Sequence, residues 1–156
     1  MNILTKEIAQ ELIETSTEIT IPHGYDIIDE GAFAFSNIKS VVIPNSVAAI
    51  ADAAFTCCAD LKSVTIPESV TVICDNAFSG CESLTEIILP TGVTKIGEHA
   101  FFNCFNLASI TMPESVKKIG KWAFDGCKNL TVYSPRNSYV HKHCTSIFRK
   151  IRWKES

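Results

Sequence analysis

The sequence lacks several features that define common functional classes. No apolar run approaches the roughly 18 residues that a membrane-spanning helix needs, so we expect no membrane insertion. Residues 1–7 have no basic segment followed by an apolar core, so no export signal is visible at that end. We therefore expect a cytoplasmic protein, with the cell surface or the exterior as the alternative if a leader has been trimmed.

Catalytic motifs are also missing. The sequence contains no GxSxG, phosphate-binding loop or HExxH motif, and its histidines are scattered along the chain: His23, His99, His141 and His143. Catalysis needs a nucleophile, a base and an orienting group brought together, and no such set is apparent. We predict no catalytic residues, no cofactor and no enzyme.

Positive charge is scarce over most of the chain. Residues 1–130 carry 8 Lys/Arg against 16 Asp/Glu, a net −8, whereas residues 131–156 carry 6 against 1, a net +5. Nucleic-acid binding needs a positive track along many phosphates, so an acidic body excludes it as the main partner. The basic tail, which includes Arg149, Lys150 and Lys154, is expected to contact acidic groups of this chain or of another molecule.

Prolines mark a repeat along the sequence. They recur at a nearly constant interval, at Pro22, Pro44, Pro67, Pro90, Pro113 and Pro135. Ala-Phe pairs follow in step, at Phe33, Phe55, Phe78, Phe101 and Phe124. A repeat whose length is in the low twenties predicts a stack of coils in place of a globule with one closed core.

One coil explains the pattern. In residues 61–67, Leu61, Val64 and Ile66 are apolar, and the end of the segment alternates apolar and polar side chains as a half-buried strand does. Pro67 ends the strand because proline has no N–H for a ladder. A second apolar pair, Val70 and Ile73, and then the Ala-Phe turn return the chain to the next strand. Parallel strands need such a crossover, and no coil can bury its apolar edge without a neighbour.

The ends of a stack need caps. We divide the chain, as one domain overall, into an N-terminal helical cap (residues 1–16), a solenoid (residues 17–135) and a C-terminal cap with the basic tail (residues 136–156). Ile8 and Leu12 lie one helical turn apart, which predicts an amphipathic helix over residues 5–15.

The repeating unit reads I-P-x-x-V-x-x-I-x-x-x-A-F-x-x-C-x-x-L-x-x-V-x-I-P. It resembles the BspA-like, treponemal-type leucine-rich repeat, and it recurs five times between Ile19 and Pro135 with a period of about 23 residues. The resemblance implies a curved, mainly β, α/β solenoid with a parallel sheet on its concave face. It also implies a binding module, of a kind often found on bacterial or protist surfaces.

Four of the seven cysteines share one phase of the repeat: Cys58, Cys81, Cys104 and Cys127. Ser36 takes that place in the first coil, so we interpret the set as a buried structural ladder with weak hydrogen bonds. Ladder residues form a row, which excludes a tetrahedral zinc site of four thiolates. Neighbouring coils are close enough for disulfides, but parallel side chains and an odd count argue against them.

Cys144 closes a cluster with His141 and His143, yet no second cluster accompanies it, so we predict no metal site.

The outward residues of the strands form columns on one face. Small hydroxyl residues dominate them, as strand propensity alone favours, and exposed aromatic anchors are missing. Val42 and Ile88 depart from this pattern. Six strands about 4.8 Å apart make a face roughly 25–30 Å wide, enough for a protein interface. We predict that this face binds a partner through Lys39, Val42, Lys62, Thr65, Glu86, Ile88 and Thr111.

Trp122 is the other departure, because the equivalent positions hold no large apolar residue. It is expected either to pack beneath the C-terminal cap or to be an exposed anchor.

The sequence favours a non-catalytic interaction module with a protein or peptide partner. The alternatives are a structural, self-assembling repeat protein, with a homo-oligomer as the outcome, and a fragment of a surface adhesin. Light scattering across ionic strength separates recognition from assembly, since oligomers held by the charge asymmetry are sensitive to salt.

We expect all seven cysteines to be free thiols, as in a reducing compartment. Thiol titration of the unfolded, non-reduced protein should find seven per chain. A smaller number would contradict the ladder interpretation.

Overall fold

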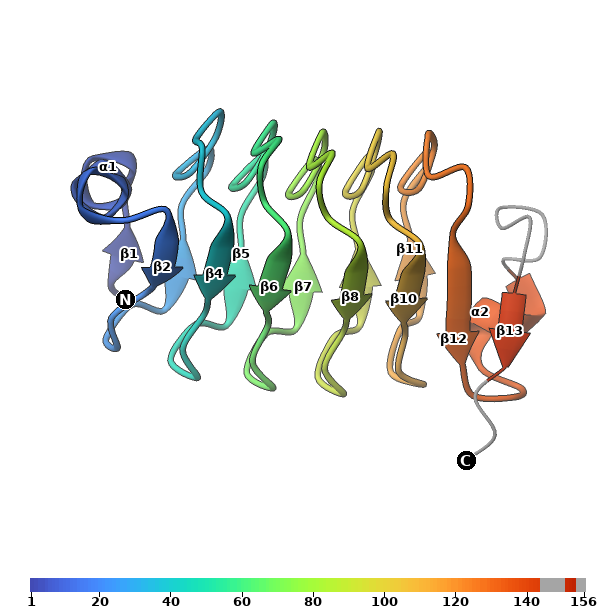
Figure 1. Cartoon of the computed structure of the whole chain (residues 1–156). Helices are drawn as coiled ribbons and strands as arrows, with labels where there is room; N and C mark the ends of the chain where they lie inside the picture. Colours follow the sequence, from blue (N-terminus) through green and yellow to red (C-terminus); the bar gives the residue numbers. More distant parts are fainter. Residues whose placement is uncertain (144–150, 154–156) are drawn as a thin grey trace.

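The computed structural model describes residues 1–143 and 151–153 and shows a parallel β-solenoid in which successive coils stack side by side (Figure 1). Each coil supplies one strand to a front face and one to a rear sheet. The front strands are β2 (Glu18–Thr20), β4 (Ser40–Val42), β6 (Ser63–Thr65), β8 (Glu86–Ile88), β10 (Ser109–Thr111), β12 (Thr131–Ser134) and β13 (Ile151–Trp153). The rear strands are β1 (Ile3–Leu4), β3 (Ile27–Ile28), β5 (Ala49–Ile50), β7 (Val72–Ile73), β9 (Lys95–Ile96) and β11 (Lys118–Ile119).

The repeat residues occupy the positions that the pattern predicts. Front strands β2 to β10 each end two residues before a proline, because proline cannot continue the ladder. The second residue of each post-proline apolar pair lies in a rear strand, and it is fully buried in every coil except the last, where Ile119 is half-buried. The sequence did not indicate that these pairs form a second sheet, since two residues are too few for a strand periodicity.

The Ala-Phe pairs build the centre of the core. Phe33, Phe55, Phe78, Phe101 and Phe124 stack along the solenoid axis with ring centroids 5.0–5.4 Å apart and planes within 8° of parallel. The first four rings are completely buried. Such aromatic contacts add about 0.5–1.5 kcal/mol per pair beyond the burial of area. The stack therefore links each coil to both neighbours.

The turn before each phenylalanine imposes a left-handed backbone. Gly31, Ala53, Asn76, His99 and Trp122 occupy the same position in successive coils, and their φ angles all lie between 52° and 59°. Only glycine adopts this conformation without a steric cost. In the first four, the N–H at this position donates to a carbonyl of the next coil at 2.8–3.1 Å, which helps to hold the turn in place.

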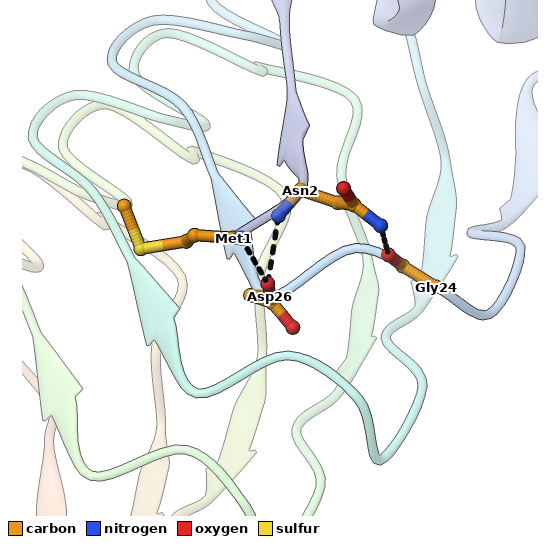
Figure 2. Close-up of polar contacts among 4 residues, drawn as sticks. All are labelled: Met1, Asn2, Gly24 and Asp26. Carbon is orange, nitrogen blue, oxygen red and sulfur yellow. Dashed lines mark hydrogen bonds and ion pairs between the residues drawn. The ribbon is translucent and has the colours of Figure 1, made fainter.

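The N-terminal end is covered by α1 (Lys6–Thr15), in agreement with the predicted helix. Ala9 is fully buried, and Ile8, Leu12 and Ile13 pack against the core. Before the helix, β1 joins the rear sheet by pairing with β3. Asp26 holds this first segment: its carboxylate accepts the Asn2 N–H at 2.7 Å and lies 3.8 Å from the terminal ammonium (Figure 2). The Asn2 side-chain amide donates to the Gly24 carbonyl at 2.9 Å.

At the other end, β12 pairs with β13, and α2 (Tyr139–His143) lies between them in the chain. Val140 is completely buried, and the hydroxyls of Ser134 and Ser138 share a buried hydrogen bond of 2.8 Å.

The phenylalanine stack predicts a large, position-specific loss of stability. Phe78→Ala should lower the free energy of unfolding by about 3–5 kcal/mol, because it empties the space between two rings in the closed core. Phe105→Ala is the matched control, since Phe105 is 45% exposed and its loss should cost within about 0.5 kcal/mol. Urea denaturation followed by circular dichroism measures both. Equal losses in the two variants would show that the stack does not hold the coils together.

Candidate partner-binding face

All seven residues predicted to bind a partner lie on the front face. Lys39 and Lys62 directly precede β4 and β6, and the others lie within β4, β6, β8 and β10. The strand register aligns Val42 with Thr65, and Ile88 with Thr111. All seven are exposed except Thr111, which is half-buried. The face therefore brings them together as neighbours in two dimensions, although they are spread along four successive coils of the chain.

Two apolar side chains depart from the hydroxyl pattern of this face. Val42 is 44% exposed and Ile88 is 61% exposed, whereas their inward neighbours Val41 and Ile87 are each 1% exposed. A strand that packs one face on the core normally turns polar side chains outward. Folding of the chain therefore leaves a large part of both aliphatic side chains exposed to water.

The register changes the predicted columns at the C-terminal side. A constant period would place Thr131 beside Ala108, but it pairs with Ser109, because the last coil is one residue shorter. Consequently Tyr133 pairs with Thr111 and continues the column of Val42, Thr65 and Ile88. The face thus carries one aromatic residue, half-buried Tyr133, that the sequence analysis did not place there. The shortened spacing between the last two prolines was the signal that could have revealed it.

The charges of the face have no ion-pair partner among the residues that the structure describes. Lys39, Lys62 and Glu86 are exposed, and no ion pair involves any of them in the described part of the chain. Exposed ion pairs are worth little in any case, so these groups are available to a partner.

The front face is divided in two. Strands β2, β4 and β6 form one sheet, and β8, β10, β12 and β13 form another. A cleft of about 440 Å³ separates β6 from β8, with Lys62, Val64 and Thr65 on one wall and Thr85, Glu86 and Ile88 on the other. The rear sheet continues without interruption from β1 to β11. The proline spacing is regular at this junction, so the sequence carries no signal of the division.

The cysteine phase forms a row of hydrogen bonds inside the solenoid. The thiols of Cys58, Cys81, Cys104 and Cys127 donate to the carbonyls of Phe33, Phe55, Phe78 and Phe101 at 3.0–3.2 Å. Ser36 takes the same place in the first coil and lies 3.4 Å from the Cys58 sulfur. Burial raises the pKa of the Cys58 and Cys81 thiols, which keeps them protonated and unreactive. All six cysteines of the described residues are free.

Among residues 1–143 and 151–153, no group of three or more His, Cys, Asp or Glu side chains could hold a metal ion. Cys144 of the His141 cluster lies outside the described residues, as do Arg149, Lys150 and Lys154 of the basic tail.

Acidic side chains at one phase of the repeat form hydrogen bonds between coils, which the sequence did not reveal. The Asp52 carboxylate accepts the N–H of Asp75 at 3.0 Å, and the Asp75 carboxylate accepts the N–H of Glu98 at 2.9 Å. Each carboxylate thus ties one coil to the next. The spacing of the acidic residues also fits a solvated outer turn, so these side-chain hydrogen bonds could not be foreseen from spacing alone.

Trp122 is 58% exposed, so the exposed alternative is the one that the structure shows. Its ring stacks on His99, with centroids 5.2 Å apart and planes 23° apart. The Lys121 ammonium lies 6.0 Å from the ring centre. The cluster belongs to the turns, away from the front strands.

Within the described residues, no helix has the length and apolar character required to cross a membrane.

Known proteins share this architecture. The BspA type leucine-rich repeat region matches residues 11–131 in six copies, where the Ala-Phe pairs indicated five. A search of curated proteins found no match.

Several solved structures are similar. One is a leucine-rich cell surface protein from Faecalibacterium prausnitzii, with 30% identity, a TM-score of 0.74 and coverage of 90% of this chain and 33% of that one. The Treponema pallidum leucine-rich repeat protein has 30% identity and a TM-score of 0.70, over 76% of this chain and 59% of that one. A Bacteroides ovatus leucine-rich repeat protein has 27% identity and a TM-score of 0.68, over 88% and 42%. The chain spans less than two thirds of the length of each of these relatives. With most of its length matched by the repeat, this chain belongs to the BspA-type leucine-rich repeat family.

Proposed function

We propose that the protein is a non-catalytic interaction module whose front face binds a protein or peptide partner. The observation that carries this proposal is the exposure of Val42 and Ile88 on a sheet face that is otherwise polar. Burying exposed aliphatic side chains against a partner is favourable, at about 25 cal/mol per Å² of apolar area.

The rest of the face suits such an interface. Tyr133 adds a half-buried aromatic ring at the C-terminal side, and tyrosine is enriched among the residues that dominate binding energy. Lys39 and Lys62 supply positive charge at one edge, and Glu18 and Glu86 supply negative charge within the next column. A partner of complementary charge would be oriented by this pattern.

Relatives in this family are repeat proteins with no enzymatic description, and the F. prausnitzii relative is described as a cell surface protein. We include in the proposal a cytoplasmic location, with surface display as the alternative. Fractionation of native cells, followed by immunodetection, distinguishes the two.

The test uses two paired substitutions. Val42→Glu with Ile88→Lys should reduce capture of the native partner at least tenfold, since burying two new charges costs more than the free energy that a tenfold change in affinity represents. Thr71→Glu with Thr94→Lys is the matched control on the outer surface of the rear side, where both threonines are exposed. Affinity capture from the native organism with quantitative mass spectrometry measures the partner.

The control pair should capture the same proteins as the unmodified chain. If the front-face pair also did so, with its circular dichroism spectrum and unfolding midpoint unchanged, the front face would not be the binding surface.

A further inference from the structure

The junction between β6 and β8 differs from every other described junction of the front face. At the other junctions between β2 and β12, a hydrogen bond flanks the strand pair on each side, as in Lys62 N–H to Lys39 O at 2.8 Å and Ile43 N–H to Thr65 O at 3.1 Å. The equivalent bonds between β6 and β8 would join Thr85 N–H to Lys62 O, and Ile66 N–H to Ile88 O. Neither is formed, and the two strands are not paired.

We propose that this β6–β8 slot, lined by residues 62–66 on one wall and by Thr85, Glu86, Ile88 and Pro90 on the other, is a binding site for an extended peptide segment. The segment forms main-chain hydrogen bonds with both unpaired strand edges. The inference deepens the proposed function, on which it rests, by naming the kind of structure that the partner contributes.

The slot is a local opening in an otherwise closed stack. Behind it, β7 and β9 are paired, with Val72 opposite Lys95 and Ile73 opposite Ile96. On one side the Ser83 N–H donates to the Ala59 carbonyl at 3.0 Å. On the other the Thr91 N–H and hydroxyl donate to the Glu68 carboxylate at 2.9 and 2.7 Å. A ligand therefore enters only from the front face.

The floor of the slot is apolar. Val64 is half-buried, although its equivalents Val41, Ile87 and Ile110 are at most 1% exposed. Ile66 is 8% exposed, compared with 0% for Met112 at the same place two coils later. The parting of the strands uncovers these side chains, so a ligand that fills the slot gains apolar contact as well as hydrogen bonds.

An extended peptide is the ligand that matches both walls. Each wall presents main-chain donors and acceptors at the spacing of a β-strand, and an unpaired strand edge is a template for another strand. A strand between β6 and β8 needs them about 9.6 Å apart, twice the ordinary spacing. Binding therefore widens the front of the slot, with the paired rear strands β7 and β9 as the hinge.

The slot also defines the composition of its ligand. Proline is excluded within the paired stretch, because each residue must donate to one wall or the other. Side chains that point inward face Val64 and must be apolar. Those that point outward lie between Thr65 and Ile88, in a column that holds both hydroxyl and aliphatic side chains.

The first test uses a peptide with the sequence of residues 106–112, end-capped and fluorescently labelled, because this stretch contains β10, the natural neighbour of β8. Fluorescence anisotropy should show saturable binding. A copy methylated on the backbone nitrogens at the Ser109 and Ile110 positions should bind at least tenfold more weakly, since it loses donors toward both walls. Absence of saturable binding, or equal binding of the methylated copy, would overturn the proposal.

A second test closes the slot chemically. Ser63→Cys with Glu86→Cys, bridged by dibromobimane in a Cys57→Ser, Cys74→Ser, Cys144→Ser background, should lose peptide binding at least tenfold. The matched control bridges Ser40→Cys with Ser63→Cys across β4 and β6, which are already paired, and should bind as before. Equal binding by the two bridged proteins would place the peptide elsewhere.

Hydrogen exchange tests the slot in the unmodified protein, so the result does not depend on whether a variant folds. The amides of Ile66 and Thr85 should exchange at least tenfold faster than those of Ile43 and Ala108, and should become protected when the peptide is bound. Equal protection in the free protein would show that the slot is closed in solution. If the bridged slot variant still captured the native partner while the Val42 and Ile88 pair did not, the proposed function would stand and the slot inference would fall.

Discussion

The structure depends on the inability of any coil to bury its own apolar edge. Each repeat has two short strands and a turn, which leave its phenylalanine ring exposed on both sides until neighbouring coils cover it. Phe78 lies 5.2 Å from Phe55 and 5.4 Å from Phe101, centroid to centroid. Hydrogen bonds also run from coil to coil along the solenoid: main-chain N–H groups and cysteine thiols donate them, and main-chain carbonyls and aspartate carboxylates accept them. Stability is a property of the interfaces between coils.

This constraint explains which parts of the fold the sequence could predict. Residues whose role repeats in every coil, such as Pro67, Phe78 and Cys81, are identified by phase alone, because the same neighbour contact must be made each time. The terminal helix followed from the spacing of Ile8 and Leu12. Features that occur in one coil only are harder to predict from the sequence. The place of Tyr133 depends on a single shortened repeat, and the proline spacing gives no sign of the division between β6 and β8.

The candidate site shows the same contrast. Val42 and Ile88 stood out because they depart from a column of polar residues, and the structure leaves both exposed. The carboxylates of Asp52 and Asp75 could not be assigned in advance, because a solvated acidic row and a row of side-chain to main-chain hydrogen bonds have the same sequence pattern. Only the approach of successive turns decides between them.

The division of the front face has a consequence for cooperativity. In a stack of repeats each unit is coupled only to its nearest neighbours, so the chain unfolds as one only where every coupling is strong. Between β6 and β8 the coupling lacks its front ladder and rests on the phenylalanine contact, the rear strands and the turns. The interface between the two halves of the solenoid is therefore the weaker one, and a ligand bridging it would strengthen the coupling between them.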